Sequence, residues 1–226
     1  MSKTKLNDHL LSKIPFNELE VVENYELNSR YLKNNKGLID QALSQYPRIM
    51  AIRFDLHFPR CYSDIDYDHS NVQFVITPFL KSLTAKLISN IKRRRKKNKR
   101  AADCRLNYIW VKEGDNDTAA HYHVVILLNN DTYNTLGKYG VFGDNLYTKI
   151  VEAWATALKI EVYDTRDLTH FPQNNIYYLK KNTVDFEAVY LSLYKRISYF
   201  AKVETKSYGN NQRNYGSSCK KRYICN

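Results

Sequence analysis

Apolar residues recur along the chain with two different periods, and the shorter period predicts strands. The segment IMAIRFDLHF alternates between apolar and polar positions and ends before Pro59, so we expect a strand there. The segments CRLNYIWVKE (104–113) and HYHVVILLNN (121–130) predict two further strands. They are joined by GDNDTAA, whose Gly, Asp and Asn residues are typical of a hairpin loop. Shorter strands are expected within 160–170 and 175–180.

The longer period, of three to four residues, predicts four helices. The first covers Arg30 to Tyr46 and ends at a proline. The second has Thr77 as N-cap and Pro78 at its first position. Its apolar stripe consists of Phe79, Leu80, Leu83, Leu87, Ile88 and Ile91. A third helix is expected over about 144–158 and a long fourth one over about 183–206.

The two central strands are apolar on both sides, which predicts helices on both faces of a sheet. Side chains alternate along a strand. One face therefore holds Ile109, Val111, Val125 and Leu127, and the other holds Tyr108, Trp110, Tyr122 and Val124. We expect an α+β fold with a central antiparallel β-sheet flanked by helices. The chain divides into a helical and polar extension (1–47), a main domain (48–208) and a polar, basic tail (209–226).

The charge is concentrated in one segment. The net charge is +12, from 35 basic and 23 acidic residues, and IKRRRKKNKR (91–100) alone holds eight of the basic residues. Without them the balance is 27 against 23, so the basicity indicates a local polyanionic partner, either nucleic acid or an anionic membrane. We expect DNA phosphates to contact this run; a solvated helix end is the alternative. The run comprises Lys92, Arg93, Arg94, Arg95, Lys96, Lys97, Lys99 and Arg100.

Other compositional features narrow the class of protein. The chain of 226 residues is 43% hydrophobic, which is enough for a packed core and excludes global disorder. No apolar run approaches 18 residues and no signal sequence is evident, so we expect a cytoplasmic protein without a membrane partner. The four cysteines have no CxxC spacing, which favours free thiols.

A cluster of ligand-type residues is predicted at one end of the hairpin. His121 and His123 are two residues apart on a strand and face the same side. If Glu113 pairs opposite His121, the three side chains emerge together and can bind Zn²⁺, Mn²⁺ or Mg²⁺. The simpler interpretation is a glutamate paired with a histidine. Asp55 and His57 share one face of the first strand, and either is a further candidate ligand.

The last predicted helix carries a second signal, centred on Tyr199. At 100° per residue, Tyr199 lies on a basic face with Lys195, Arg196, Lys202 and Lys206, whereas Tyr190 and Tyr194 lie on the apolar face. Lys202 is a helical neighbour of Tyr199. Lys195, Arg196 and Lys206 form a field suited to an anionic phosphate, and we expect them to contact DNA. A phenol is mostly protonated at neutral pH. A nearby ammonium and a metal-polarised phosphate would both favour attack by its oxygen.

These motifs together resemble those of HUH endonucleases, which include rolling-circle replication initiators. The resembling segments are RFDLHFP, a glutamate eight residues before HYH, HYH with its apolar strand, and Tyr-x-x-Lys on a later helix. More narrowly, RFDLHFP, YIWVKE, HYHVVILLN, AWATAL, LTHFP and RISYFAKVETK are similar to the inovirus gene-II-protein-like family, also called the YagK/YfjJ C-terminal domain family. The resemblance runs from about residue 48 to residue 216.

The resemblance implies a role for each matching residue. His121 and His123 would hold a divalent metal, Mg²⁺ or Mn²⁺ with Zn²⁺ as a further option, and Glu113 would be the third ligand. Tyr199 would attack single-stranded DNA or an origin hairpin and form a 5′-phosphotyrosine, with Lys202 assisting. The expected function is a nickase that initiates rolling-circle replication of a phage, satellite or plasmid in a bacterial host.

Several points stay open at the level of the sequence. No GxxxxGK[ST] motif is present, so a host helicase and polymerase are expected as partners. The same chemistry could serve mobilisation or transposition instead. A prophage-derived DNA-binding regulator without nicking activity is the alternative from another class. The oligomeric state is not indicated.

Overall fold

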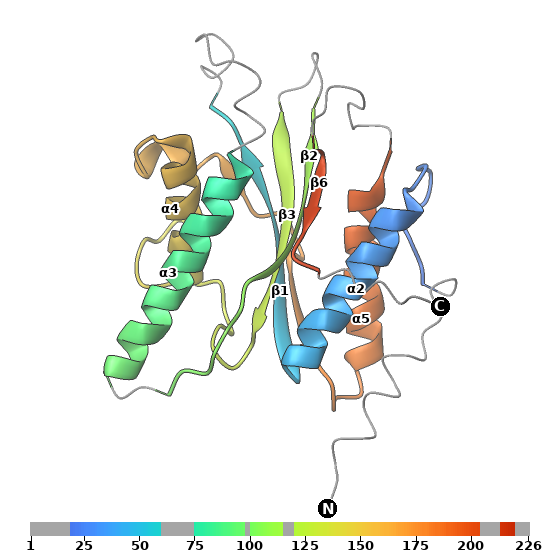
Figure 1. Cartoon of the computed structure of the whole chain (residues 1–226), viewed down its shortest axis with the longest axis horizontal. Coiled ribbons are helices and arrows are strands. Elements are labelled where there is room, and N and C mark those ends of the chain that lie inside the picture. The colour runs from blue at the N-terminus through green and yellow to red at the C-terminus, as the bar shows by residue number, and fades with distance from the viewer. Residues whose placement is uncertain (1–18, 60–74, 98–99, 115–119, 204–212, 220–226) are drawn as a thin grey trace, which may run out of the picture.

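A computed structural model describes residues 19–59, 75–97, 100–114, 120–203 and 213–219, and a six-stranded sheet is its centre (Figure 1). The strands are β1 (Arg48–His57), β2 (Asn107–Glu113), β3 (His121–Asn129), β4 (Thr169–His170), β5 (Ile176–Lys180) and β6 (Tyr215–Ser217). Their order is β4-β1-β3-β2-β6, with β5 also paired to β1, and every pairing is antiparallel.

Helices cover both faces of this sheet, as the apolar pattern predicted. They are α2 (Ser29–Gln45), α3 (Ile76–Lys96), α4 (Leu146–Leu158) and α5 (Phe186–Ser198), with short 3₁₀ turns η4 (Tyr163–Thr165) and η5 (Tyr199–Ala201). Helices α3 and α4 lie on one face, and α2 and α5 lie on the other (Figure 1). The α+β fold class is therefore confirmed.

Each face of the sheet has its own hydrophobic core. Trp110, Tyr122 and Trp154 belong to the cluster under α3 and α4. Val125 and Tyr194 belong to the cluster under α2 and α5. The predicted assignment of alternate residues of β2 and β3 to opposite faces is confirmed, because one pleated pair of strands separates the two clusters.

The start of α3 differs from the prediction. Val75 occupies the N-cap position without a capping side-chain hydrogen bond, so Thr77 lies inside the first turn and is not the N-cap. Burial of Ile76, which is 1% exposed, outweighs the local preference for a capping hydroxyl. Ile88 was placed with the apolar stripe but is 45% exposed, whereas the other stripe residues are buried.

The last helix is shorter than predicted. α5 ends at Ser198, Tyr199–Ala201 form a 3₁₀ turn, and Lys202 has an extended ψ of 136°. The segment before α2 replaces the helical hydrogen bonds: Asn28 donates to the Ala201 carbonyl, and Val203 donates to the Glu26 carbonyl. A helical projection is therefore wrong for Lys202, and Lys206 lies outside the described residues.

Smaller differences concern the ends of the main domain. Only Thr169–His170 of the segment 160–170 is a strand, and η4 precedes it. The segment predicted as a tail contributes β6 to the sheet edge beside β2. The boundary predicted at residue 47 falls between α2 and β1, both of which supply residues to one core cluster.

Several sequence predictions can be followed only in part. Cys104 and Cys219 are free thiols, while Cys61, Cys225 and the centre of the GDNDTAA loop lie outside the described residues. Within the described ranges, no helix combines the length and apolar character that crossing a bilayer requires.

Candidate metal centre and tyrosine site

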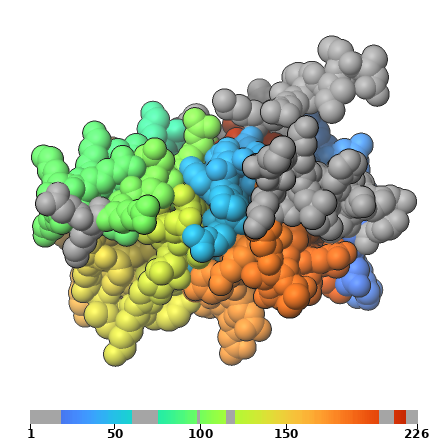
Figure 2. Space-filling model, turned by 90° about the horizontal axis from the view of Figure 1, so that it is seen from below, coloured from blue at the N-terminus to red at the C-terminus, as the bar shows by residue number. Residues whose placement is uncertain are grey.

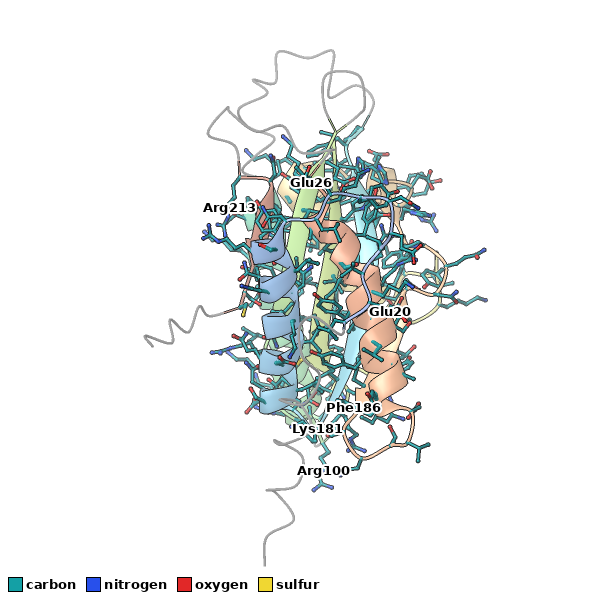
Figure 3. The ribbon with its side chains drawn as sticks, turned by 90° about the vertical axis from the view of Figure 1, so that its right-hand side faces the viewer. Glu20, Glu26, Arg100, Lys181, Phe186 and Arg213 are labelled. Atoms are coloured by element: carbon teal, nitrogen blue, oxygen red, sulfur yellow. The ribbon has the colours of Figure 1, made fainter. Side chains whose placement is uncertain are left out.

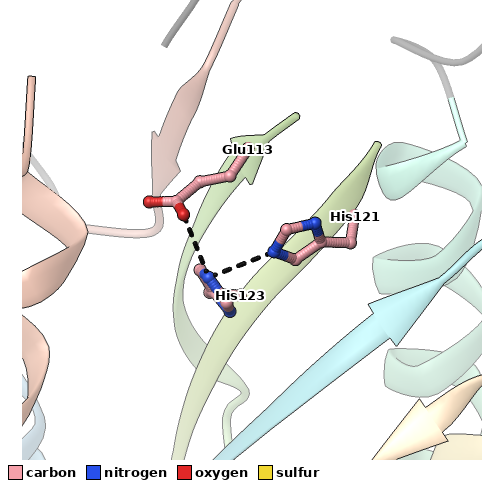
Figure 4. Close-up of side chains that lie close together, drawn as sticks. All are labelled: Glu113, His121 and His123. Carbon is pink, nitrogen blue, oxygen red and sulfur yellow. Dashed lines mark hydrogen bonds and ion pairs between the residues drawn. The ribbon is translucent and has the colours of Figure 1, made fainter. Parts of the chain in front are cut away.

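Glu113, His121 and His123 meet at one end of the β2–β3 pair (Figure 4). The antiparallel register places Glu113 directly opposite His121, as predicted. The Nε2 atoms of the two histidines are 3.3 Å apart, and Nε2 of His123 is 3.2 Å from Oε2 of Glu113. One ligand-type atom from each residue lies within 4.8 Å of the others. This donor set, two imidazoles and a carboxylate, suits a divalent cation.

Asp55 holds His123 from the opposite side. The register of β1 and β3 pairs Asp55 with His123, and Oδ1 of Asp55 is 2.5 Å from Nδ1 of the ring. Arg53 donates from Nη1 to the other Asp55 oxygen at 3.1 Å. A proton held on Nδ1 leaves Nε2 facing Glu113 and His121, which is the arrangement of a metal-ligating histidine supported by a carboxylate. Asp55 is thus placed behind a candidate ligand.

His57 and His170 lie beside the group of Glu113, His121 and His123 but are not members of it. The His57 ring stacks on the His121 ring, with centroids 5.3 Å apart and planes 15° from parallel. Nδ1 of His170 is 3.4 Å from Oδ2 of Asp55, and the His170 side chain is 59% exposed. The sequence alone did not indicate Arg53 as part of the site. The signal that could have found it is its spacing, because residues 53, 55 and 57 lie on one face of the strand.

The protonation of the cluster follows from these contacts. Burial opposes the charged form of Asp55, but the hydrogen bond to His123 and the charges of His123 and Arg53 hold its pKa below the ordinary value. Burial lowers the pKa of His123, but Asp55 and Glu113 together raise it above the ordinary value. Burial and the neighbouring His121 lower the pKa of His57. The cluster is therefore a strongly coupled acid–imidazole group.

Tyr199 faces this cluster from the η5 turn. Its ring centroid is 5.7 Å from that of His123, and Phe200 stacks against the same imidazole. Burial, followed by the charge of Glu113, raises the pKa of Tyr199 to about 12, and a hydrogen bond to Glu113 adds to this. The phenol is therefore protonated at neutral pH and lies beside the carboxylate of the candidate metal site. Tyr194 is fully buried in the core, as predicted.

Lys202 and Tyr25 complete the surroundings of Tyr199. The Lys202 ammonium lies 4.4 Å from the ring centroid of Tyr25 and 5.6 Å from that of Tyr199. Tyr25 itself packs edge-on against Tyr199, with centroids 5.7 Å apart. Tyr25 was missed at the sequence level because it belongs to a segment distant in sequence. The main-chain bonds of residues 26 and 28 bring that segment against η5.

The two basic residues of the last α5 turn have different surroundings. Lys195 forms an exposed ion pair with Glu20 at 3.0 Å. Arg196 donates to the Gln173 carbonyl at 3.3 Å. The pKa of Arg53 is lowered by burial first and then by the charge of Arg196, whereas the charge of Asp55 raises it. Arg196 is therefore close to the cluster, whereas Lys195 is directed to the segment before α2.

The basic run lies at the opposite end of the sheet. Arg94 donates to the Thr132 carbonyl at 2.7 Å, and Arg95 pairs with Asp103, so the run meets the start of β2 and the residues after β3. Seven-residue β2 separates that end from Glu113 by about 20 Å. Figure 2 views this end, with the green side chains of α3 at its edge. In Figure 3, Arg100 lies at this end and Glu26 and Arg213 lie at the other.

The members of the run also differ among themselves. Arg93 pairs with Asp144 at 2.5 Å, and Arg94 and Arg95 have the partners given above. Lys92, Lys96, Lys97 and Arg100 are exposed, and Lys99 lies outside the described residues. Arg93, Arg94 and Arg95 therefore bind residues of neighbouring segments and have a partly structural role. The exposed residues Lys92, Lys96, Lys97 and Arg100 form none of the ion pairs between described residues.

Comparisons with known proteins identify relatives along most of the chain. A sequence model of the YagK/YfjJ C-terminal domain matches residues 15–218. The uncharacterized protein YagK of Escherichia coli (strain K12) is 37% identical over 195 residues, covering 82% of this chain and 90% of that protein. The uncharacterized protein YfjJ of the same strain is 33% identical over 195 residues, covering 84% of this chain and 94% of that protein. No solved structure matches.

Proposed function

We propose that this chain, which belongs to the YagK/YfjJ C-terminal domain family, is a metal-dependent nickase for single-stranded DNA. The observation that carries the proposal is the convergence of Glu113, His121 and His123 beside the hydroxyl-bearing ring of Tyr199. The sequence resemblance to HUH endonucleases supports the same assignment. The proposed biological use is initiation of rolling-circle replication in a bacterial cell.

The residues suggest a division of labour. A divalent ion, Mg²⁺ or Mn²⁺ with Zn²⁺ as the alternative, would be held by Glu113, His121 and His123 and would polarise a scissile phosphate. The Tyr199 oxygen would attack phosphorus, form the 5′-phosphotyrosine bond and release the 3′-oxygen of the preceding nucleotide. Because its pKa is raised to about 12 without an ion, Tyr199 needs nearby positive charge to lose its proton.

Lys202 and Arg196 would supply protein charge near that step. The Lys202 ammonium is 5.6 Å from the Tyr199 ring centroid, close enough to favour the phenolate and an anionic phosphate. Arg196 lies near Arg53 and the cluster. Lys195, which we predicted as a DNA contact, is paired with Glu20, so a DNA strand would compete with that ion pair.

Two other uses of the site remain as alternatives. The same phosphotyrosine chemistry would serve a relaxase or transposase, and these differ from a replication initiator in the DNA substrate. A DNA-binding regulator without nicking activity would not need Tyr199 beside the metal ligands. The expected partners, a host helicase and polymerase, belong to the replication proposal alone.

The direct test is the formation of a covalent protein–DNA adduct. The protein is incubated with Mn²⁺ and a library of single-stranded oligonucleotides, and products are separated on denaturing gels. We expect an adduct whose peptide maps to Tyr199, and no adduct in EDTA or with Tyr199→Phe. Absence of an adduct with Mg²⁺, Mn²⁺ and Zn²⁺, or a DNA-linked peptide at another residue, would overturn the assignment.

A further inference from the structure

A groove runs along α3 on the face of the sheet opposite the metal ligands. Two hollows, of about 550 and 510 Å³, adjoin there and share Thr84 and Ile88 of α3 in their linings. One continues toward Thr77 and the other toward Arg95. At 1.5 Å per residue, these two positions are about 27 Å apart along the helix.

The groove connects the two ends of the molecule that matter for DNA. Its upper part is lined by Trp110, three residues before Glu113, and by Arg213, which precedes β6. Figure 3 places Arg213 at the end of the molecule where the metal ligands lie. Its lower part is lined by Lys92 and Arg95 of the basic run. The groove therefore joins the site end of the sheet to the charge cluster at the far end.

Positive charge dominates the groove lining. Its cations are Lys81, Lys92, Arg95, Arg105 and Arg213, and its acid is Asp103, which pairs with Arg95 at 2.8 Å. Among the described residues, neither Lys81 nor Lys92 forms an ion pair, and both are exposed. A lining of this composition complements a polyanion.

Apolar surface lies between these charges. Ile88 is 45% exposed at the point where the two hollows meet. Half-buried Tyr108 lines the upper hollow beside Trp110, which is itself only 6% exposed and has the Arg213 guanidinium 5.8 Å from its ring centroid. Nucleobases stack on such surface when they are not paired, whereas a duplex presents mainly phosphates.

We propose that this groove binds single-stranded DNA, with phosphates on Lys81 and Lys92 and bases against Ile88 and Tyr108. The strand would extend from the metal ligands around the end of β2 and along α3 to the basic run. This path explains why the exposed lysines lie so far from Tyr199. The proposed function concerns the DNA at the cleavage position, and this inference adds a site for the DNA beyond it. Only the biological purpose of the groove rests on the proposed function.

Binding is tested in EDTA, so that cleavage does not contribute. The affinity for a fluorescent oligothymidylate of about 20 nucleotides is measured by anisotropy over a range of salt concentrations. We expect Lys81→Gln with Lys92→Gln to weaken binding at least fivefold and to lower the salt slope by about 1.4, or about 0.7 per lost phosphate contact. The matched control is Lys138→Gln with Lys180→Gln, two exposed lysines outside the groove, which should change neither quantity appreciably.

A second pair of variants tests the apolar part. Ile88→Glu places a carboxylate where the hollows meet and should weaken binding at least tenfold, whereas Val184→Glu, at a fully exposed position, should not. Equal effects of groove and control variants would overturn the proposal. Tighter binding of a duplex through the same residues would also overturn it. A bound oligothymidylate that does not protect α3 and β6 from hydrogen exchange would overturn it as well. The last result would leave the groove to a protein partner.

The outcomes separate this inference from the proposed nickase activity. If the groove variants lose oligothymidylate binding and no DNA adduct forms on Tyr199, the groove stands and the nickase proposal fails. If the groove variants bind DNA normally while Tyr199 still forms an adduct, the groove proposal fails and the nickase activity stands.

Discussion

Oδ1 of Asp55 lies 2.5 Å from Nδ1 of His123, across the β1–β3 register that pairs these two residues. The contact positions the ring so that Nε2 faces the other two candidate ligands. Asp55 is in turn held by Arg53. A carboxylate in this position makes the imidazole a better and more rigid metal ligand without touching the ion.

Asp55→Asn should weaken metal binding without unfolding the protein. The amide keeps the size of the side chain but removes the charge that supports His123, so we expect Mn²⁺ affinity to fall between about 10-fold and 100-fold. Isothermal titration calorimetry measures this. Asp103→Asn is the matched control, because the Asp103 side chain is 89% exposed at the other end of the sheet. Unchanged affinity in Asp55→Asn would show that the contact does not support a ligand.

Stability and metal binding should respond to pH in opposite directions. The pKa of His123 is raised above 6.5 in the folded protein. Its protonated form therefore stabilises the metal-free fold fully below about pH 6.5, and this contribution is lost as pH rises through the folded-state pKa. A metal ion needs the neutral ring and so competes with the proton.

The increase in melting temperature caused by a fixed Mn²⁺ concentration should accordingly be larger at pH 8 than at pH 6. Thermal unfolding followed by circular dichroism at both pH values measures it. His123→Gln should show a small Mn²⁺ effect at either pH. An increase that is the same at pH 6 and pH 8 in the wild-type protein would contradict the role of His123 as a ligand.

Tyr199 and Tyr194 should respond differently to the same substitution. Tyr199→Phe removes the proposed attacking oxygen and should abolish the adduct while leaving oligonucleotide and Mn²⁺ binding in place. The Tyr194 hydroxyl is buried and makes no hydrogen bond to any described residue. Tyr194→Phe should therefore keep adduct formation and leave the free energy of unfolding unchanged or raised by up to about 1 kcal/mol. Mass spectrometry of the adduct and urea unfolding measure the two effects.

The lysine at the site should matter more for rate than for stability. Lys202→Ala should slow adduct formation about 100-fold, the scale for a group positioned to handle charge or a proton. Tyr25→Leu removes the ring face under the ammonium and should slow it less, because Lys202 itself remains. Single-turnover rates at saturating DNA distinguish these effects from weakened binding. Equal rates for wild type and Lys202→Ala would remove Lys202 from the chemistry.

Within the basic run, arginines and lysines should have separable roles. Arg94 is half-buried and donates to the Thr132 carbonyl, so Arg94→Gln should lower the free energy of unfolding by about 1 kcal/mol or more. Lys96 is exposed, and Lys96→Gln should change stability by less than about 0.5 kcal/mol. Urea unfolding of the two variants measures this. Equal stability would show that the Arg94 contact is not structural.

Much of the sheet and of the candidate metal site was predictable from the sequence. Period-two alternation located β1, β2 and β3, and it assigned Ile109 and Trp110 to opposite cores, because a pleated strand has only two faces. Glu113, His121 and His123 could be grouped for the same reason, once a short connection implied a hairpin. These relationships depend on residues close together in sequence.

Contacts between distant segments were decided only in the tertiary structure. The η5 turn replaces the end of the predicted helix because residues 26–28 satisfy its main-chain groups, and local helix propensity cannot anticipate a partner segment about 175 residues away. Tyr25 reaches Tyr199 by the same docking. Asp55 became a support for His123 through the register between β1 and β3, which side-chain burial on both faces determines.

The basic run illustrates the remaining limit. The sequence by itself determined its charge and its place at the end of a helix, since both are local properties. Its distance from Tyr199 follows from the direction in which α3 crosses the sheet, with its first turn near the site and its last turn near the start of β2. That direction is set by the packing of α3 against the sheet and α4, because burial of an apolar stripe fixes a helix on a face.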